Sequence, residues 1–266
     1  MSKTFVITGA SAGLGKAMAL QAATYGAKVA LLARRAEKLA AVADEIREAG
    51  GEALAVPTDI SDANQVVQAF RTVHQKWHKI DVLVNNAGVI NPIAPIHDFD
   101  ENELDKLLKI NVFGSFLAMR EALIIMRHQQ DGTIVNITSG AAYKPYEGWG
   151  AYGSSKAAMD MMTRIAAAEN AEKNICIFAI APGVFASNMQ DTIRQTPAEK
   201  FPPLQKFIEL HEKGYLSDPA DVGSLIAQVG LNAWPELNGK VLDIRDVDFQ
   251  NEIKLNGLII PGALAV

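Results

Sequence analysis

The segment Thr4-Phe-Val-Ile-Thr8-Gly9-Ala-Ser-Ala-Gly13-Leu-Gly15 predicts the fold of the whole chain. Its first five residues read as a short buried strand, and an alanine-rich helical run follows the glycines as far as Gly26. A strand, a glycine-rich turn and a helix in this order open a βαβ unit. Such glycines let the backbone approach a pyrophosphate, for which the helix N-terminus offers free N–H groups. The alternative is a loop that needs small residues only for packing.

Two arginines follow the second predicted strand, residues 28–33. Arg34 and Arg35 lie about 20 residues beyond the glycine turn, where a dinucleotide-binding fold contacts the adenosine ribose. An acidic residue there would bind the 2′-hydroxyl of NAD, whereas a guanidinium group matches the 2′-phosphate of NADP. We therefore expect NADP(H) as the cofactor and consider NAD less favoured. The alternative is a solvated basic pair, although cations that open a helix oppose its dipole.

Strands and helices alternate along the rest of the chain. Further strands are expected at residues 53–57, 80–84, 132–137, 174–180 and 239–245, and the main helices at 66–77, 101–127, 152–170 and 218–231. This alternation predicts a single-domain, Rossmann-type α/β fold, with a doubly wound parallel sheet of about seven strands and helices on both faces. We assign residues 1–245 to this domain and residues 246–266 to a C-terminal tail.

Polar and small residues follow several of these strands. Asn85-Asn86-Ala87-Gly88 ends the fourth strand, and Ser139 follows the fifth. The carboxyl ends of parallel strands are where open α/β sheets bind ligands. Asp59, after the third strand, either accepts a hydrogen bond from an adenine amino group or caps the next helix, as Asp62 also could.

Tyr152 and Lys156 begin an apolar, alanine-rich helical pattern. On a helix the spacing of four places both side chains on one face, one turn apart. A lysine ammonium beside a tyrosine favours the phenolate, so we expect a lowered Tyr152 pKa. Such a phenol can exchange a proton with a carbonyl or alcohol oxygen near neutral pH. Taken alone, the pair is more often an ordinary surface pair on a helix.

Asn111 lies inside the long helix expected at residues 101–127. Asparagine is a poor residue for a helix interior because its amide competes for backbone hydrogen bonds. It is either a tolerated packing residue or the mark of a local helix distortion that holds a water.

The helical pattern loosens at about residues 189–215, where three prolines interrupt it and aromatic residues supply apolar surface. Such an insertion is typical of a lid or a binding segment.

Bulk properties exclude several classes of protein. The chain has 266 residues, a formal net charge of −5 and a pI of about 5.6, which gives no electrostatic footprint for nucleic acid. We see no signal peptide and no apolar run near the roughly 20 residues of a membrane span. The single cysteine, Cys176, fits a reducing compartment, so we expect a cytoplasmic protein. His74 and His78 lack a third ligand, so no metal site is predicted.

Together these residues resemble a short-chain dehydrogenase/reductase of the classical type, over about residues 4–245. Thr8-Gly9-x-x-x-Gly13-x-Gly15 resembles the cofactor turn of that family, and Pro182-Gly183 with Ser187 resembles its Pro-Gly motif. Asn111, Ser139, Tyr152 and Lys156 match its catalytic tetrad in order and spacing.

The resemblance implies a role for each member of the tetrad. Tyr152 is the acid/base. Lys156 lowers its pKa and holds the nicotinamide ribose, while Ser139 polarises the carbonyl and Asn111 holds a water that relays protons. The cofactor is expected to contact Gly9, Ser11, Gly13, Leu14, Gly15, Arg34, Arg35, Asp59, Ile60, Asn86, Ala87, Gly88, Tyr152, Lys156, Pro182, Gly183, Val184 and Ser187. The small-molecule substrate is expected to contact Ser139, Tyr146, Trp149, Tyr152 and Met189.

Two departures from the family pattern affect these expectations. NADP-binding members often carry a base just before the middle glycine, but this chain has Ala12, so the NADP assignment rests on Arg34 and Arg35. The region after the last strand is longer and more apolar than usual. A homo-oligomer is expected, with a dimer through the Asn111 and Tyr152 helices favoured over a tetramer.

The leading functional hypothesis is an oxidoreductase that transfers a hydride between NADP(H) and a ketone or aldehyde, or the matching alcohol. An NAD-dependent alcohol dehydrogenase of the same family is one alternative. A non-catalytic dinucleotide-binding regulator is another, although it need not retain the tetrad. Sugar-nucleotide epimerases and dehydratases share Tyr-x-x-x-Lys but have a differently spaced glycine turn and a larger substrate domain.

Overall fold

The computed structural model describes residues 2–260 of the chain, which form a parallel sheet of seven strands in the order β3-β2-β1-β4-β5-β6-β7. The strands are β1 Thr4–Thr8, β2 Lys28–Ala33, β3 Glu52–Pro57, β4 Val82–Asn85, β5 Asp131–Ile137, β6 Asn174–Ala181 and β7 Val241–Asp243. Every neighbouring pair is parallel, which confirms the predicted doubly wound sheet. The strand order reverses between β1 and β4, so a crevice is expected beyond the carboxyl ends of these two strands.

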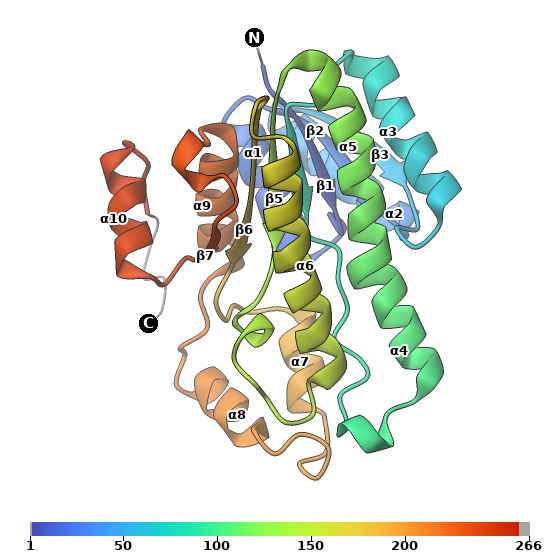
Figure 1. Cartoon of the computed structure of the whole chain (residues 1–266), viewed down its shortest axis with the longest axis vertical. Coiled ribbons are helices and arrows are strands. Elements are labelled where there is room, and N and C mark those ends of the chain that lie inside the picture. Colours follow the sequence, from blue (N-terminus) through green and yellow to red (C-terminus); the bar gives the residue numbers. More distant parts are fainter. Residues whose placement is uncertain (1, 261–266) are drawn as a thin grey trace.

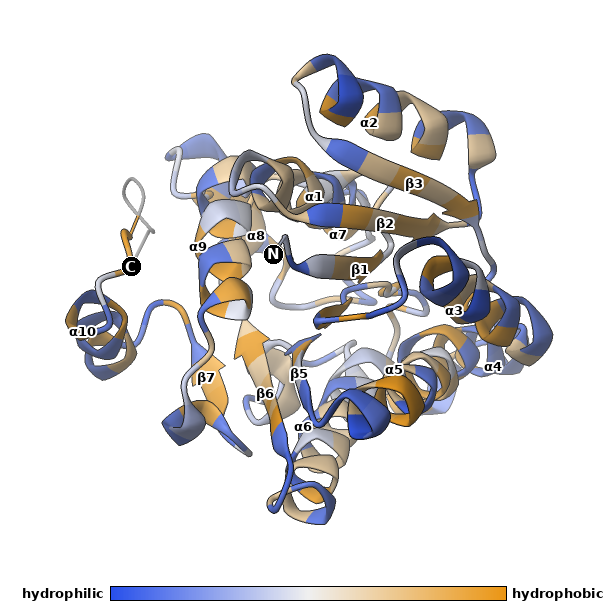
Figure 2. Ribbon diagram, turned by 90° about the horizontal axis from the view of Figure 1, so that it is seen from above, coloured by the Kyte–Doolittle hydropathy of each residue, from blue (hydrophilic) through white to orange (hydrophobic). Residues whose placement is uncertain are grey.

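Helices cover both faces of the sheet (Figures 1 and 2). They are α1 Gly13–Thr24, α2 Ala36–Glu48, α3 Ala63–Trp77, α4 Glu101–Leu108, α5 Ser115–Gln129, α6 Gly150–Glu169, α7 Asn188–Arg194, α8 Leu204–Glu212, α9 Pro219–Leu231 and α10 Val247–Leu255. No helix among residues 2–260 is both long enough and apolar enough to cross a membrane.

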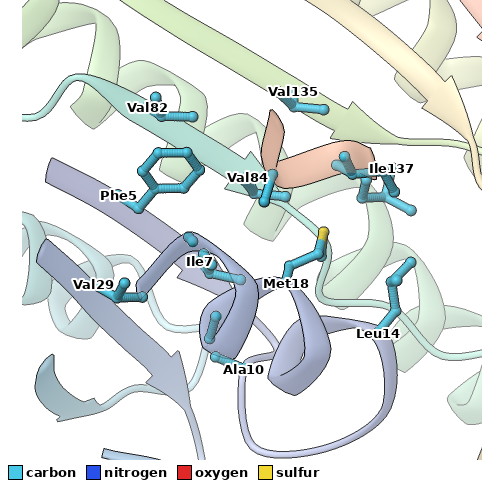
Figure 3. Close-up of a cluster of buried hydrophobic side chains, with 14 of the residues drawn as sticks. Phe5, Ile7, Ala10, Leu14, Met18, Val29, Val82, Val84, Val135 and Ile137 are labelled. Carbon is cyan, nitrogen blue, oxygen red and sulfur yellow. The ribbon is translucent and has the colours of Figure 1, made fainter. Parts of the chain in front are cut away.

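The buried apolar residues form one core on each face of the sheet. Successive side chains of a strand point to opposite faces, so Phe5 and Ile7 enter one core and Val6 enters the other. The first core packs α1, α2 and α9 against the sheet and also includes Phe249 and Ile253 of α10. Figure 3 shows its centre, where Met18 of α1 meets the strand residues. The second core packs α3, α5 and α6 against the opposite face. These two layers hold the carboxyl ends of the strands in fixed positions.

The helix expected at residues 101–127 is not continuous. A π-helical segment, η2 Lys109–Gly114, separates α4 from α5 and contains Asn111. π-Helical turns inside α-helices are frequent at functional sites. Of the two readings of Asn111, the structure therefore bears out a local helix distortion.

The predicted tail contains a helix, α10, that was not among the expected elements. Asp246 caps α10 by accepting hydrogen bonds from two backbone N–H groups, and Phe249 and Ile253 are buried in the first core. The Gln228 side chain on α9 accepts a hydrogen bond from the Ile259 N–H and donates one to the Ile259 carbonyl oxygen. Residues 261–266 of the predicted tail lie outside the described residues.

Candidate active site

Two cavities lie beyond the carboxyl ends of the central strands, and Gly88 after β4 lines both. The first cavity, of about 270 Å³, is lined by Tyr152, Lys156 and Ser139, and we call it the Tyr152 cavity. The second, of about 300 Å³, is lined by Arg34 and is called the Arg34 cavity. Because they share Gly88, the two cavities form one cleft along the end of the sheet.

The glycine turn after β1 is shaped by close backbone approaches. Gly9 and Gly13 have φ values of +69° and +53°, in the left-handed region that favours glycine. A Cβ on Gly15 would lie 2.3 Å from the Gly9 carbonyl oxygen, so any side chain there would displace the turn. Asn86 Nδ2 donates to the Thr8 carbonyl oxygen at 2.9 Å, and Thr8 Oγ1 accepts from the Asn86 N–H at 3.0 Å. The turns after β1 and β4 are thereby locked together.

The Arg34 cavity brings together the residues expected at the adenosine end of a dinucleotide. Arg34 and Arg35 are exposed side chains on its wall, and Arg35 Nη2 donates to Ser11 Oγ at 3.1 Å. The Asp59 carboxylate accepts from the Ser61 N–H and hydroxyl, whereas Asp62 caps α3. Capping was therefore the wrong alternative for Asp59, whose side chain lines the cavity.

Tyr152, Lys156 and Ser139 converge at one end of the Tyr152 cavity. Tyr152 and Lys156 lie one turn apart on α6 and are both buried, at 7% and 4% exposure. Lys156 Nζ lies 5.8 Å from the centre of the Tyr152 ring and donates to the Ile137 carbonyl oxygen at 2.8 Å. Ser139 follows β5 and lines the same cavity, where its side chain favours the Tyr152 phenolate. The predicted acid/base pair and its serine are thus assembled from separate elements.

Burial dominates the protonation of both groups on α6. It raises the pKa of Tyr152 to about 12, although the hydrogen bond with Ser139 acts in the opposite direction. It lowers the pKa of Lys156 to about 8, although the charge of Asp160 one turn further along opposes this shift. The expectation of a lowered Tyr152 pKa is therefore wrong for this structure. Desolvation of the phenolate is the largest cause of the shift, and Ser139 offsets only part of it.

Asn111 joins the π-helical segment to α6. Its Oδ1 accepts from the Val89 N–H at 2.8 Å, and its Nδ2 donates to the Val89 carbonyl oxygen at 2.8 Å and to Ser155 Oγ at 3.0 Å. Ser155 Oγ in turn donates to the Tyr152 carbonyl oxygen at 2.7 Å. Both amide hydrogens of Asn111 are therefore used, and its side chain fixes the loop after β4 against α6.

The substrate residues expected from sequence lie together on the wall of the Tyr152 cavity. Tyr146 and Trp149 belong to the loop before α6, and Met189 to α7. Trp149 stacks on Phe201 with ring centres 5.0 Å apart and meets the Tyr152 ring edge-on at 5.6 Å. Helices α7 and α8, from the segment where the pattern loosens, lie below the sheet in Figure 1.

Most of the expected cofactor residues line the cleft. The Tyr152 cavity is lined by Leu14, Asn86, Gly88, Tyr152, Lys156, Pro182, Gly183, Val184 and Ser187. The Arg34 cavity is lined by Gly9, Ser11, Arg34, Arg35, Asp59, Ile60, Ala87 and Gly88. Gly13 and Gly15 shape the turn without lining either cavity. Across residues 2–260 no three metal-ligating side chains come together.

Sequence reasoning missed several residues of the cavity wall. Lys206, Phe207 and Leu210 of α8 line it, as do Tyr215 and Arg245 after α8 and β7. The sequence indicates Phe207 and Tyr215 as apolar surface of the segment at about residues 189–215, but it does not assign them to the substrate site. Nothing in the local pattern indicated that Lys206 and Arg245 would reach the same cavity as Tyr152.

Comparison with known proteins gives one consistent family. The family model for short chain dehydrogenases matches residues 3–198. A diacetyl reductase ((S)-acetoin forming) of Staphylococcus epidermidis is 32% identical over 247 residues, which cover 90% of this chain and 96% of that protein. A benzil reductase ((S)-benzoin forming) of Bacillus cereus is 33% identical over 232 residues, which cover 83% of this chain and 91% of that protein.

The fold agrees with this assignment. The crystal structure of the KRED1-Pglu enzyme superposes with a TM-score of 0.85 at 34% identity, and the match covers 90% of this chain and 100% of the other. The chain therefore belongs to the short-chain dehydrogenase family, whose members are oxidoreductases that act on CH–OH and C=O groups with a nicotinamide dinucleotide.

Proposed function

We propose that the protein is an NADP(H)-dependent carbonyl reductase that uses Tyr152 as its acid/base. The observation that carries this proposal is the meeting of Ser139, Tyr152 and Lys156 at one end of an aromatic cavity, which shares Gly88 with an arginine-lined cavity. Because glycine has no side chain, the glycine turn and Gly88 let the backbone itself face the cavities. Such a backbone surface fits an extended dinucleotide.

The proposed reaction divides the work between cofactor and protein. The bound dinucleotide supplies the hydride that the carbonyl carbon accepts. Tyr152 donates its phenolic proton to the carbonyl oxygen, so hydride and proton together give the alcohol, and oxidation is the reverse. Ser139, which lines the same cavity, donates to the same oxygen and stabilises the charge that develops on it. The raised pKa keeps Tyr152 protonated at neutral pH, as the reducing direction requires.

Lys156 and Asn111 would return the proton to Tyr152. Lys156 lies beside the Tyr152 ring with a pKa of about 8, so it exchanges protons near neutral pH, and it would also hold the nicotinamide ribose. The Asn111 amide hydrogens are engaged by Val89 and Ser155. A relay water would therefore bind Asn111 through an oxygen, either the second lone pair of Oδ1 or the backbone carbonyl.

The substrate proposed for this cavity is a ketone with apolar or aromatic substituents. The rings of Tyr146, Trp149 and Phe207 form one side of the cavity, with Trp149 centred 4.9 Å from Tyr146 and 5.2 Å from Phe207. The names of two relatives, diacetyl reductase and benzil reductase, refer to ketones with adjacent carbonyl groups. NADPH consumption across a panel of diketones, simple ketones and keto esters tests the proposal. Absence of turnover with all of them would contradict it.

Replacing Arg34 with alanine should weaken the binding of NADPH far more than the binding of NADH. A guanidinium–phosphate contact contributes roughly 1.5–3 kcal/mol, so KM for NADPH should rise about 10- to 100-fold. KM for NADH should change by less than about 2-fold, because NADH has no 2′-phosphate. Initial-rate kinetics with both cofactors measures this.

Arg71→Ala is the matched control, because Arg71 is exposed on α3 and, within residues 2–260, its side chain has one hydrogen-bond partner, Gln68. Equal losses with both cofactors in Arg34→Ala would contradict recognition of the 2′-phosphate. That outcome would favour the NAD-dependent alternative.

A homodimer through α4–α5 and α6 is also proposed. Phe113, Phe116 and Ile124 are about half exposed on η2 and α5, as are Met161 and Ile165 on α6. Large apolar side chains gathered on neighbouring helices are typical of protein–protein interfaces. Light scattering should give twice the 28.6 kDa mass of the chain, and a monomer at micromolar concentration would refute the assignment.

A further inference from the structure

The wall of the Tyr152 cavity carries positive charge without a matching acid. Its lining residues include three cations, Lys156, Lys206 and Arg245, but no aspartate or glutamate. Lys156 belongs to the proposed catalytic group. The other two lie on elements that sequence motifs did not assign to the site, and each is a candidate for selecting a substrate.

Arg245 is neutralised by a neighbour outside the cavity wall. Its Nε donates to Asp243 Oδ1 at 2.9 Å, and its Nη2 donates to Asp243 Oδ2 at 2.6 Å. Such a bidentate pair leaves little net charge. The Arg245 side chain packs beside Gly183, where a Cβ would lie 3.3 Å from Arg245 Cδ. Arg245 therefore forms part of the wall but is a weak candidate for binding an anion.

Lys206 has no such partner. Its Nζ is hydrogen-bonded to the Tyr146 hydroxyl at 3.3 Å and lies 5.4 Å from the centre of that ring. Among the described residues, no carboxylate pairs with it. The nearby acid of its own helix, Glu209, is already bonded to Gln205 and Lys213. Lys206 thus brings an unneutralised ammonium group and free N–H donors to the cavity.

The position of Lys206 in its helix also favours an anion. It is the third residue of α8, which has no acidic residue in its first turn. A cation there opposes the helix macrodipole, whereas a negative group near the same turn would be attracted by both the dipole and the ammonium.

A continuous aromatic surface separates Lys206 from the catalytic tyrosine. Starting from Tyr152, the next ring is Trp149 at 5.6 Å, and Tyr146 follows at 4.9 Å from Trp149. Phe207 closes the group at 6.1 Å from Tyr146. The cavity therefore has a proton donor at one end, an apolar middle, and a cation with a hydroxyl at the other end.

We propose that Lys206, together with the Tyr146 hydroxyl, binds a carboxylate at the far end of the substrate, so that the preferred substrates are oxo acids whose ketone and carboxylate are separated by an apolar spacer. This inference rests on the proposed carbonyl reductase activity. Neutral ketones would still be reduced at Tyr152, but with a higher KM than an acid of the right length.

The test uses methyl-ketone acids of six to ten carbons, each paired with its methyl ester. The ester keeps the ketone and spacer but removes the charge. For the best chain length we expect kcat/KM of the acid to exceed that of its ester roughly 10-fold at low salt, and added salt to reduce the difference. Lys206→Gln should lower kcat/KM for the acid by about 10-fold, mainly through a higher KM. It should change kcat/KM for the ester by less than about 2-fold.

Three further variants sharpen this test. Lys206→Arg should retain most of the preference for the acid because the charge remains. Tyr146→Phe should lose part of it. Lys213→Gln is the matched control, because Lys213 lies at the end of the same helix, is paired with Glu209 and does not line the cavity.

The outcomes separate this inference from the function on which it rests. Reduction of the esters without any preference for the acids would overturn the role of Lys206 and leave the reductase activity standing. An equal effect of Lys206→Gln on acid and ester would overturn it as well, since it would indicate a structural role. No turnover of either series, or of any ketone in the wider panel, would refute the proposed function itself.

Discussion

The variant Tyr152→Phe should lose carbonyl reduction almost completely while still binding the dinucleotide. Phenylalanine keeps the buried ring that packs edge-on against Trp149 but removes the hydroxyl that is proposed to transfer its proton to the carbonyl oxygen. General acid catalysis typically contributes about 10²- to 10⁴-fold, so kcat should fall by roughly 10³-fold. Single-turnover kinetics with saturating NADPH measures the loss, and fluorescence titration with NADPH measures the retained binding.

Tyr143→Phe is the matched control for this prediction. Tyr143 is 70% exposed, lies in the segment between β5 and α6, and does not line the Tyr152 cavity. Removal of the Tyr143 hydroxyl should leave kcat within about 2-fold of the wild-type value, because a surface hydroxyl contributes little to a buried reaction centre. If Tyr152→Phe kept activity within about 10-fold of the wild type, another group would have to be the acid.

Lys156→Met should have two effects of opposite sign, a large loss of activity and a gain in stability at neutral pH. The cation beside the Tyr152 ring is lost, and with it the proposed proton relay and ribose contact, so kcat should fall by about 10²-fold or more. At pH 7 the wild type keeps a charged lysine in a buried site. The lowering of its pKa from 10.5 to about 8 corresponds to at most about 3 kcal/mol of destabilisation.

Methionine removes that cost but also removes the hydrogen bond to the Ile137 carbonyl oxygen, which contributes about 1 kcal/mol. The variant should therefore be more stable than the wild type at pH 7 by about 1–2 kcal/mol, as measured by urea denaturation.

The pH dependence of this stability difference has a defined sign. The folded wild type releases the Lys156 proton near pH 8, whereas the unfolded chain holds it up to its ordinary value of 10.5. Between these values the unfolded state binds more protons, so the free energy of unfolding of the wild type rises with pH. The methionine variant lacks this rise. A gap that stayed constant between pH 7 and about pH 10 would contradict the lowered pKa of Lys156.

Strong local patterns made the fold and the position of the site predictable. The glycine turn after β1 and the alternation of strands and helices indicated the parallel sheet, because each pattern reflects a local constraint on the backbone. The helix distortion at Asn111 was foreseen as one of two readings from a single residue of poor helix propensity. Ser139, just after β5, and Tyr152, in the first turn of α6, then meet in one cavity beyond the strands.

Properties that depend on packing were not predictable in the same way. The spacing of Tyr152 and Lys156 indicated an electrostatic effect but not how deeply the phenol is buried, and burial reverses the direction of the pKa shift. The helix α10 could have been found from its Asp246 cap with Phe249 and Ile253 on one face. The contact of Lys206 with Tyr146 joins residues 60 positions apart, and no local pattern encodes it.

A hydride and a proton should be delivered together to a ketone in the Tyr152 cavity. The most direct test is reduction of a diketone by the wild-type protein with NADPH that carries deuterium on one or the other face of the nicotinamide C4, followed by mass spectrometry of the alcohol. One of the two labelled cofactors should place a single deuterium on the carbinol carbon, and the other should place none. Alcohol without label from both would contradict direct hydride transfer. Tight NADPH binding without any alcohol, from this ketone or the panel, would instead identify a non-catalytic dinucleotide-binding protein.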